Sequence, residues 1–195
     1  MRPFSFPLMA LAIVGKTVAS PVAAESSIPD LPDGFFSGYN NADGTNTLIF
    51  RDLNQTFTFV PRPALVDESP QIEKRQSESD CWNYDKLNVA GVDDAIRQLR
   101  EYIGYYGVLV VGNTWGNPAY FGFNSGGVYA YFCWNTDMPL EANVNMRALD
   151  RYTSWMDRDC GPYMPGYSPR DSWILFGKCK SGTPVCLGNP RSPRP

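Results

Sequence analysis

Hydrophobic residues recur with helical spacing in two stretches of the chain. In the first, the spacing i, i+3, i+4, i+7, i+10 and i+11 is met by Val92, Ala95, Ile96, Leu99, Tyr102 and Ile103. Asp93 and Asp94 suit the first turn of this helix, and Gly104 suits its C-terminal cap. A second helix is predicted from about Val144 to Arg158, ended by Gly161-Pro162, with a buried stripe made of Ala148, Leu149, Tyr152, Trp155 and Met156.

Strand candidates lie between and after these helices, at Val108–Val111, Ala119–Phe123, Val128–Trp134 and Trp173–Gly177. Residues 124–127 are typical of a hairpin loop between the second and the third. The third carries bulky side chains on both faces, which predicts a central strand with helices over one side. We therefore expect an α+β domain with an antiparallel sheet of about four strands and two helices on one face.

The N-terminus has a different pattern. Met1-Arg2 gives a positive start, residues 4–14 form an apolar run, and small residues follow, as in a secretory signal peptide. A membrane anchor is the alternative, but the run has only about half of the roughly 20 residues that span a bilayer. We expect a signal peptide over residues 1–19, cut by signal peptidase after Ala19, with a cut after Ala24 as the alternative.

A dibasic pair, Lys74-Arg75, divides the remaining chain in a stretch of linker composition. Kexin-type proteases of the secretory pathway cut after such pairs in exposed chain, although an ordinary surface pair is the alternative. Cleavage would leave residues 20–75 as a pro-segment and 76–195 as the mature domain, with a disordered proline-rich tail at 190–195. The N-glycosylation sequon at Asn54 lies upstream of the cut, so the mature domain would carry no N-glycan.

The predicted pro-segment contains three short strand candidates, at residues 35–39, 47–50 and 56–60. One interpretation is a small β-meander that packs on the mature domain during folding or masks its active surface. The other is a spacer with transient β-structure.

All five cysteines lie beyond residue 80, and in a secreted protein they indicate a disulfide framework: Cys81, Cys133, Cys160, Cys179 and Cys186. Their odd number leaves one thiol free or shared with another molecule, and the spacing alone leaves the pairing open. The loop Cys179–Cys186 is either a recognition loop or a stapled C-terminus, closed in one interpretation by its own disulfide.

Charge and residue types restrict the chemistry. Residues 76–195 have a net charge of −1 and no basic stripe, which argues against nucleic-acid binding and electrostatic membrane anchoring. The chain has no histidine, so Ser-His-Asp, Cys-His and histidine–zinc sites are excluded. No carboxylate pair has a spacing that points to a glycosidase. We expect no catalytic residues, no cofactor and no metal.

Aromatic residues in predicted loops are the remaining candidates. Tyr105 and Tyr106 follow the first helix, and the other candidates for a binding surface are Trp115, Tyr163, Tyr167, Lys178 and Lys180. Such aromatics suit sugar stacking or protein contact. For each of the aromatic residues, filling of a thin core is the alternative.

Three stretches together resemble a group of small secreted, kexin-processed proteins of filamentous fungi that are effector-like. They are Gly127–Cys133, the helix end Trp155–Cys160 and the closing stretch Gly177–Gly188. The resemblance implies no reaction. A looser likeness is to the killer-toxin fold encoded by viruses of smut fungi, and it implies pairing of Cys81 with Cys160.

We therefore expect an extracellular, effector-like or toxin-like protein that binds a protein or glycan of a host or competitor without catalysis. A cell-wall or carbohydrate-binding protein is the alternative, with a glycoside hydrolase as a remote third.

Overall fold

The computed structural model describes residues 28–61, 79–82, 85–111, 120–134, 141–171 and 174–186. The predicted signal peptide with Ala19, the Lys74-Arg75 pair, Trp115 and the tail lie outside these residues.

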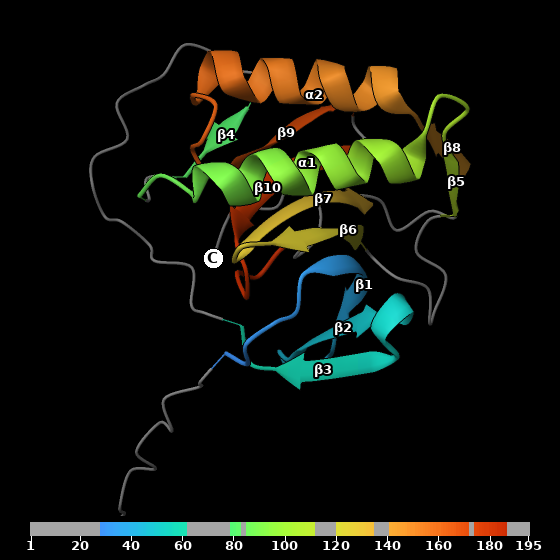
Figure 1. The fold of residues 1–195 in the computed structure, drawn as a ribbon, viewed down its shortest axis with the longest axis vertical. Helices are drawn as coiled ribbons and strands as arrows, with labels where there is room; N and C mark the ends of the chain where they lie inside the picture. Colours follow the sequence, from blue (N-terminus) through green and yellow to red (C-terminus); the bar gives the residue numbers. More distant parts are fainter. Residues whose placement is uncertain are drawn as a thin grey trace, which may run out of the picture.

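The described chain contains two helices and two antiparallel sheets (Figure 1). The helices are α1 (Val89–Ile103) and α2 (Met146–Asp159), and a short 3-10 turn, η1, covers Arg51–Leu53. The main sheet has the order β3-β2-β1-β6-β7-β10-β9-β4. Its strands are β1 (Gly34–Asn40), β2 (Asn46–Phe50), β3 (Gln55–Phe59), β4 (Asp80–Cys81), β6 (Tyr120–Ser125), β7 (Val128–Trp134), β9 (Gly166–Asp171) and β10 (Ile174–Lys180). A separate two-stranded sheet pairs β5 (Val108–Val111) with β8 (Glu141–Val144).

The expected α+β class is confirmed, but the expected number of strands was too small. The three strands predicted in residues 20–75 are present as β1, β2 and β3, and they belong to the main sheet. β4, β8 and β9 were not predicted. β4 has only two residues, β8 includes Asn143, and β9 includes Gly166 and Pro169, residue types that lower strand propensity.

Both helices begin at an asparagine cap. The Asn88 side chain accepts a hydrogen bond from the Gly91 N–H at 3.3 Å, and the helix starts there. Asp93 and Asp94 therefore lie in the second turn of α1, and their predicted place in the first turn was wrong. Gly104 ends α1 with φ +58°, as predicted.

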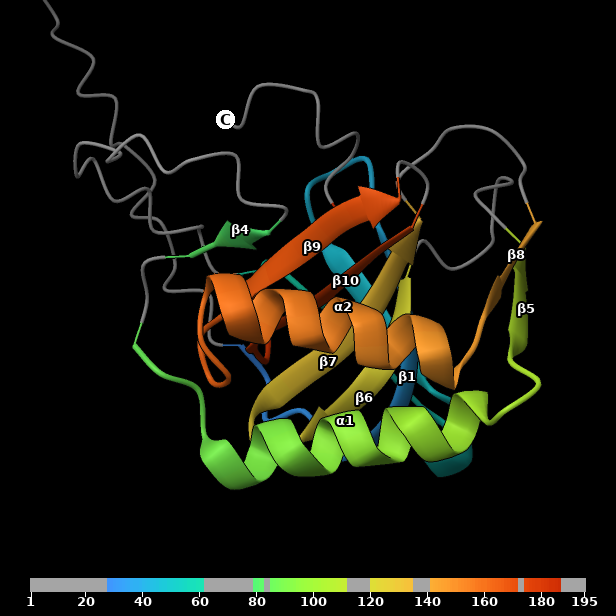
Figure 2. The same cartoon turned by 90° about the horizontal axis from the view of Figure 1, so that it is seen from above.

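Both helices cover the same face of the main sheet (Figure 2). Their buried stripes meet Phe121, Phe132 and Phe176 from the sheet, and consist of Ala95, Leu99 and Ile103 on α1 and Leu149, Tyr152 and Met156 on α2. The predicted arrangement of two helices over one face is thus confirmed, with β7 in a central position.

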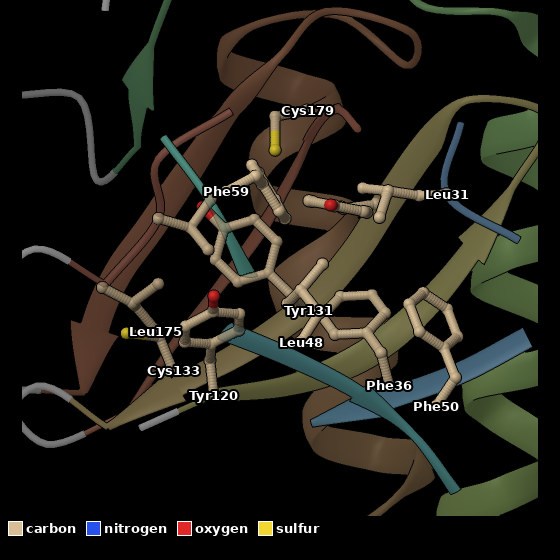
Figure 3. Packing of buried hydrophobic residues seen from close by; sticks show 12 residues of the cluster. Leu31, Phe36, Leu48, Phe50, Phe59, Tyr120, Tyr131, Cys133, Leu175 and Cys179 are labelled. Carbon is tan, nitrogen blue, oxygen red and sulfur yellow. The ribbon is translucent and has the colours of Figure 1, made fainter. Parts of the chain in front are cut away.

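The opposite face is covered by the N-terminal strands (Figure 3). We call its buried residues the aromatic cluster: Leu31, Phe36, Leu48, Phe50, Phe59, Tyr120, Tyr129, Tyr131, Cys133, Leu175, Cys179 and Val185. Leu48 on β2 shares this cluster with Leu175 on β10, although β10 lies four positions further along the strand order. The sheet is therefore curled. Its N-terminal strands fold back over the face of β6, β7 and β10 that points away from the helices.

Two disulfides staple the domain. Cys81–Cys160 joins β4 to the end of α2, and Cys133–Cys186 joins β7 to the segment after β10. The first is the pairing that the killer-toxin likeness implies. The interpretation that a disulfide between Cys179 and Cys186 closes their loop was wrong, because Cys179 is a free, buried thiol. In the chain-entropy description each disulfide stabilises the fold by about 4 kcal/mol.

Candidate binding surface

Three tyrosines with exposed side chains lie at or just after the C-terminal end of α1, and we call them the tyrosine patch. Tyr102 is 47% exposed, Tyr105 67% and Tyr106 89%. The rings of Tyr105 and Tyr106 lie 5.5 Å apart and are perpendicular. Contiguous exposed apolar surface marks interaction sites when it is large, whereas singly exposed hydrophobic residues are ordinary.

The turn that carries the patch is held by neighbouring elements. The Asn143 side-chain amide donates a hydrogen bond to the Tyr106 carbonyl at 3.1 Å, and the Met146 N–H donates to the Gly104 carbonyl at 3.3 Å. Gly107 has φ +83°, and a Cβ there would overlap the Asn143 side chain and lie 2.8 Å from the Val144 carbonyl. The two tyrosines are thus presented by a turn that is fixed against β8 and the start of α2.

The third tyrosine of the patch rests on the N-terminal strands. Phe35 of β1 stacks on Tyr102, with the ring centroids 4.3 Å apart and the planes 25° from parallel. Phe123 of β6 meets the same ring edge-on at 6.0 Å. The position of Tyr102 therefore depends on a residue from the predicted pro-segment.

Three charged side chains of α1 near the patch have partners of opposite sign. Arg100 of α1 makes two hydrogen bonds to the carboxylate of Asp150 on α2, at 2.6 and 2.9 Å. Arg97 pairs with Asp94 and with Glu101. Such exposed pairs add little stability, but they leave the tyrosine rings as the distinctive chemistry of this surface.

The residues predicted to form a binding surface do not lie together in the structure. Tyr163 is half-buried and packs on Leu87, Val92 and Val128. Tyr167 lies in β9 with its ring 6.1 Å from that of Trp82. Both are part of the core packing and lie outside the patch, whereas Lys180 is exposed at the end of β10.

Lys178 was wrongly placed on the surface by the sequence analysis. Its side chain is 0% exposed, and its ammonium donates a 2.6 Å hydrogen bond to Asp157 Oδ1 and another to the Pro162 carbonyl. Burial lowers the pKa of the Lys178 ammonium, and the bond to Asp157 opposes that shift. The period-two alternation from Phe176, which faces the helices, would have predicted the buried position.

Asp94 of α1 is held as an anion by its hydrogen-bond partners. Asp94 accepts hydrogen bonds from the Ser125 hydroxyl at 2.7 Å and the Gln98 amide at 2.6 Å. The Ser125 bond, followed by Arg97, lowers the pKa of Asp94. A general acid needs the opposite shift. Within the described ranges, no group of three metal-binding side chains occurs.

The sequon at Asn54 is in a position that a glycosyltransferase can reach. Asn54 is exposed and lies between η1 and β3, with φ 51°. The structure thus places this predicted site on the outer surface of the N-terminal strands.

Comparison of the chain with protein-family models, with curated proteins and with solved structures finds no match. Neither α1 nor α2, the helices of the described part, is long and apolar enough to cross a membrane.

Proposed function

We propose that the chain is a secreted, effector-like or toxin-like protein that acts by binding a protein target of a host or competitor, rather than by catalysis. The observation that carries this proposal is the exposure of Tyr105 and Tyr106 on a turn that the fold holds in place. The proposal includes secretion through the signal peptide and cleavage after Arg75, as the sequence predicts.

The chemistry of the tyrosine patch supports a protein target. Tyrosine provides a large apolar area and a hydrogen-bonding hydroxyl, and it is enriched among the residues that dominate protein interfaces. A turn that is already ordered loses little conformational entropy on binding. The rings of Tyr105 and Tyr106 are perpendicular, so they do not form the continuous flat platform on which a sugar chain stacks.

The acidic residues support a role without catalysis. Asp94 is kept ionised by its hydrogen bonds, while Asp150 and Asp157 each pair with a cation. Each of these carboxylates thus has a partner within the fold. The predicted absence of a catalytic site is therefore retained in the proposal.

Binding of the fluorescently labelled, secreted protein tests the proposal. We would measure saturable binding to protoplasts of candidate hosts and competing fungi, and in parallel to insoluble chitin and β-glucan. The double variant Tyr105→Ala/Tyr106→Ala should bind protoplasts at least tenfold more weakly, as expected for two interface aromatics. Its urea unfolding should be unchanged, because both rings are exposed.

Leu53→Ala is the matched control, because Leu53 is also exposed but lies in η1, away from the patch. It should bind as the wild type does. Unchanged protoplast binding by the double tyrosine variant would contradict the proposal. Binding that goes entirely to chitin or β-glucan would favour the carbohydrate-binding alternative.

A further inference from the structure

We infer that residues 28–61 are a permanent part of the working protein and that, after cleavage behind Arg75, they stay bound as a second chain without a covalent link. This inference rests on the secretion and processing in the proposed function, but not on the tyrosine patch. It concerns an interaction surface whose occupant is the chain's own N-terminal segment.

The first reason is the pairing of β1 in the middle of the main sheet. β1 pairs with β6 from Gly34↔Asn124 to Gly38↔Tyr120, and with β2 on its other side. Loss of residues 28–61 would turn β6 into an open edge strand. Open edges of this kind promote aggregation and are normally covered.

The second reason is the apolar face that these residues cover. Leu31, Phe36, Leu48, Phe50 and Phe59 are each at most 8% exposed, and all five come from the N-terminal segment. They pack on the tyrosines, Leu175 and Cys179 of the aromatic cluster (Figure 3). Departure of the segment would expose one whole face of the sheet to water, which the hydrophobic effect opposes.

The third reason is a set of hydrogen bonds just before β1 and at its last residue. The Asn124 side-chain amide donates to the carbonyls of Leu31 and Pro32, at 3.0 and 2.8 Å. The Asn40 amide donates to the carbonyls of Val185 and Cys186, at 3.1 and 2.9 Å. Asn124 is fully buried beneath the segment, so these hydrogen bonds lie away from water, where a hydrogen bond is electrostatically stronger.

No covalent bond would hold the segment after the cut. It contains no cysteine, and both disulfides lie downstream of residue 75. The retained chain would also carry the exposed Asn54 sequon. The working protein would therefore be an N-glycosylated, two-chain particle, whereas the mature domain alone has no sequon.

The experiment is a controlled cut of the purified precursor, secreted from yeast. A kexin-type protease is applied first, and a site-specific protease sequence inserted after Arg75 is used if kexin leaves the chain whole. The cut protein is diluted through the micromolar range and followed by size-exclusion chromatography and native mass spectrometry. We expect one 1:1 particle whose smaller chain loses mass on enzymatic deglycosylation.

Separation of the two chains at micromolar concentration, with the larger chain remaining a folded monomer, would overturn the inference. The double variant Phe36→Ala/Leu48→Ala should shift dissociation to at least tenfold higher concentration after the cut. Val60→Ala, an exposed position on the same segment, should not shift it. If the double variant fails to fold, the wild-type dilution series still decides.

The result is independent of any target. A stable two-chain particle that binds no cell would leave this inference standing while the proposed function fails. If the chains dissociate and the larger one still binds cells through the tyrosine patch, the proposed function stands and this inference fails.

Discussion

The ring of Tyr120 lies against the backbone of Gly38, so closely that a Cβ at position 38 would be 2.6 Å from two of its carbons. A methyl group of Leu48 would be 2.7 Å from the same Cβ. Only glycine leaves room for this contact. It occurs where the predicted pro-segment meets the predicted mature domain, which shows that the two parts are packed as one core.

Gly38→Ala should destabilise the full chain by about 1–3 kcal/mol, because the added methyl group overpacks the aromatic cluster. Urea unfolding followed by tryptophan fluorescence measures the change. Equal stability of Gly38→Ala and the wild type would show that β1 does not lie where the structure places it.

Ser37→Ala is the matched control on the same strand. The Ser37 hydroxyl is buried and makes no hydrogen bond with the described residues. Its removal should leave stability unchanged or raise it slightly, since a buried hydroxyl without a partner is unfavourable. Destabilisation as large as that from Gly38→Ala would mean that any change in β1 is harmful.

The pair Lys178–Asp157 should respond asymmetrically to substitution. Asp157→Asn leaves a fully buried cation without its counter-charge and should cost about 3 kcal/mol. Lys178→Met removes the cation and leaves Asp157, whose side chain is 35% exposed, free to be solvated. Lys178→Met should therefore cost much less, and urea unfolding of the two variants gives the comparison. A larger loss for Lys178→Met would contradict the burial of this amine.

Ser125→Ala should weaken the fold at neutral pH but not in strong acid. The Ser125 hydroxyl is the main cause of the lowered pKa of Asp94, whose ordinary value is 3.8. A lowered carboxyl pKa stabilises the fold above the unfolded value and loses this effect as pH falls through the folded value. Urea unfolding at pH 7 and at several values below 3.8 should show the two proteins converging in acid.

Asp94→Asn provides the control for this pH dependence, because it removes the titrating group. In that background, the effect of Ser125→Ala should be the same at every pH. A difference that still changes with pH would assign the titration to another carboxyl group.

Local patterns predicted the elements that local forces determine. The apolar stripe of Val92 to Ile103 located α1, and the bulky side chains on both faces of β7 indicated a central strand. The start of α1 was missed because the Asn88 cap lies before the stripe begins. The N-terminal strands were predicted, but their place in the sheet depends on pairs such as Gly34↔Asn124, which are remote in sequence.

The surface was harder to predict than the fold. Tyr105 and Tyr163 are both loop tyrosines near glycine in the sequence. Their exposure differs only because of tertiary packing. Leu87 and Val128 pack against Tyr163, whereas Tyr105 stays 67% exposed. For Lys178 the sequence did contain the signal. The alternation of β10 places it on the same buried face as Phe176, but its charge suggested a surface position.

The alkylation rate of Cys179 is the most direct test that residues 28–61 belong to the working protein. The thiol is fully buried within the aromatic cluster, and burial raises its pKa, so it should be unreactive in the full chain under native conditions. We would express residues 76–195 alone and measure alkylation with and without a synthetic peptide of residues 28–61. The account predicts rapid alkylation of the isolated domain and protection when the peptide is present. Equal protection of Cys179 in the isolated domain without the peptide would contradict it.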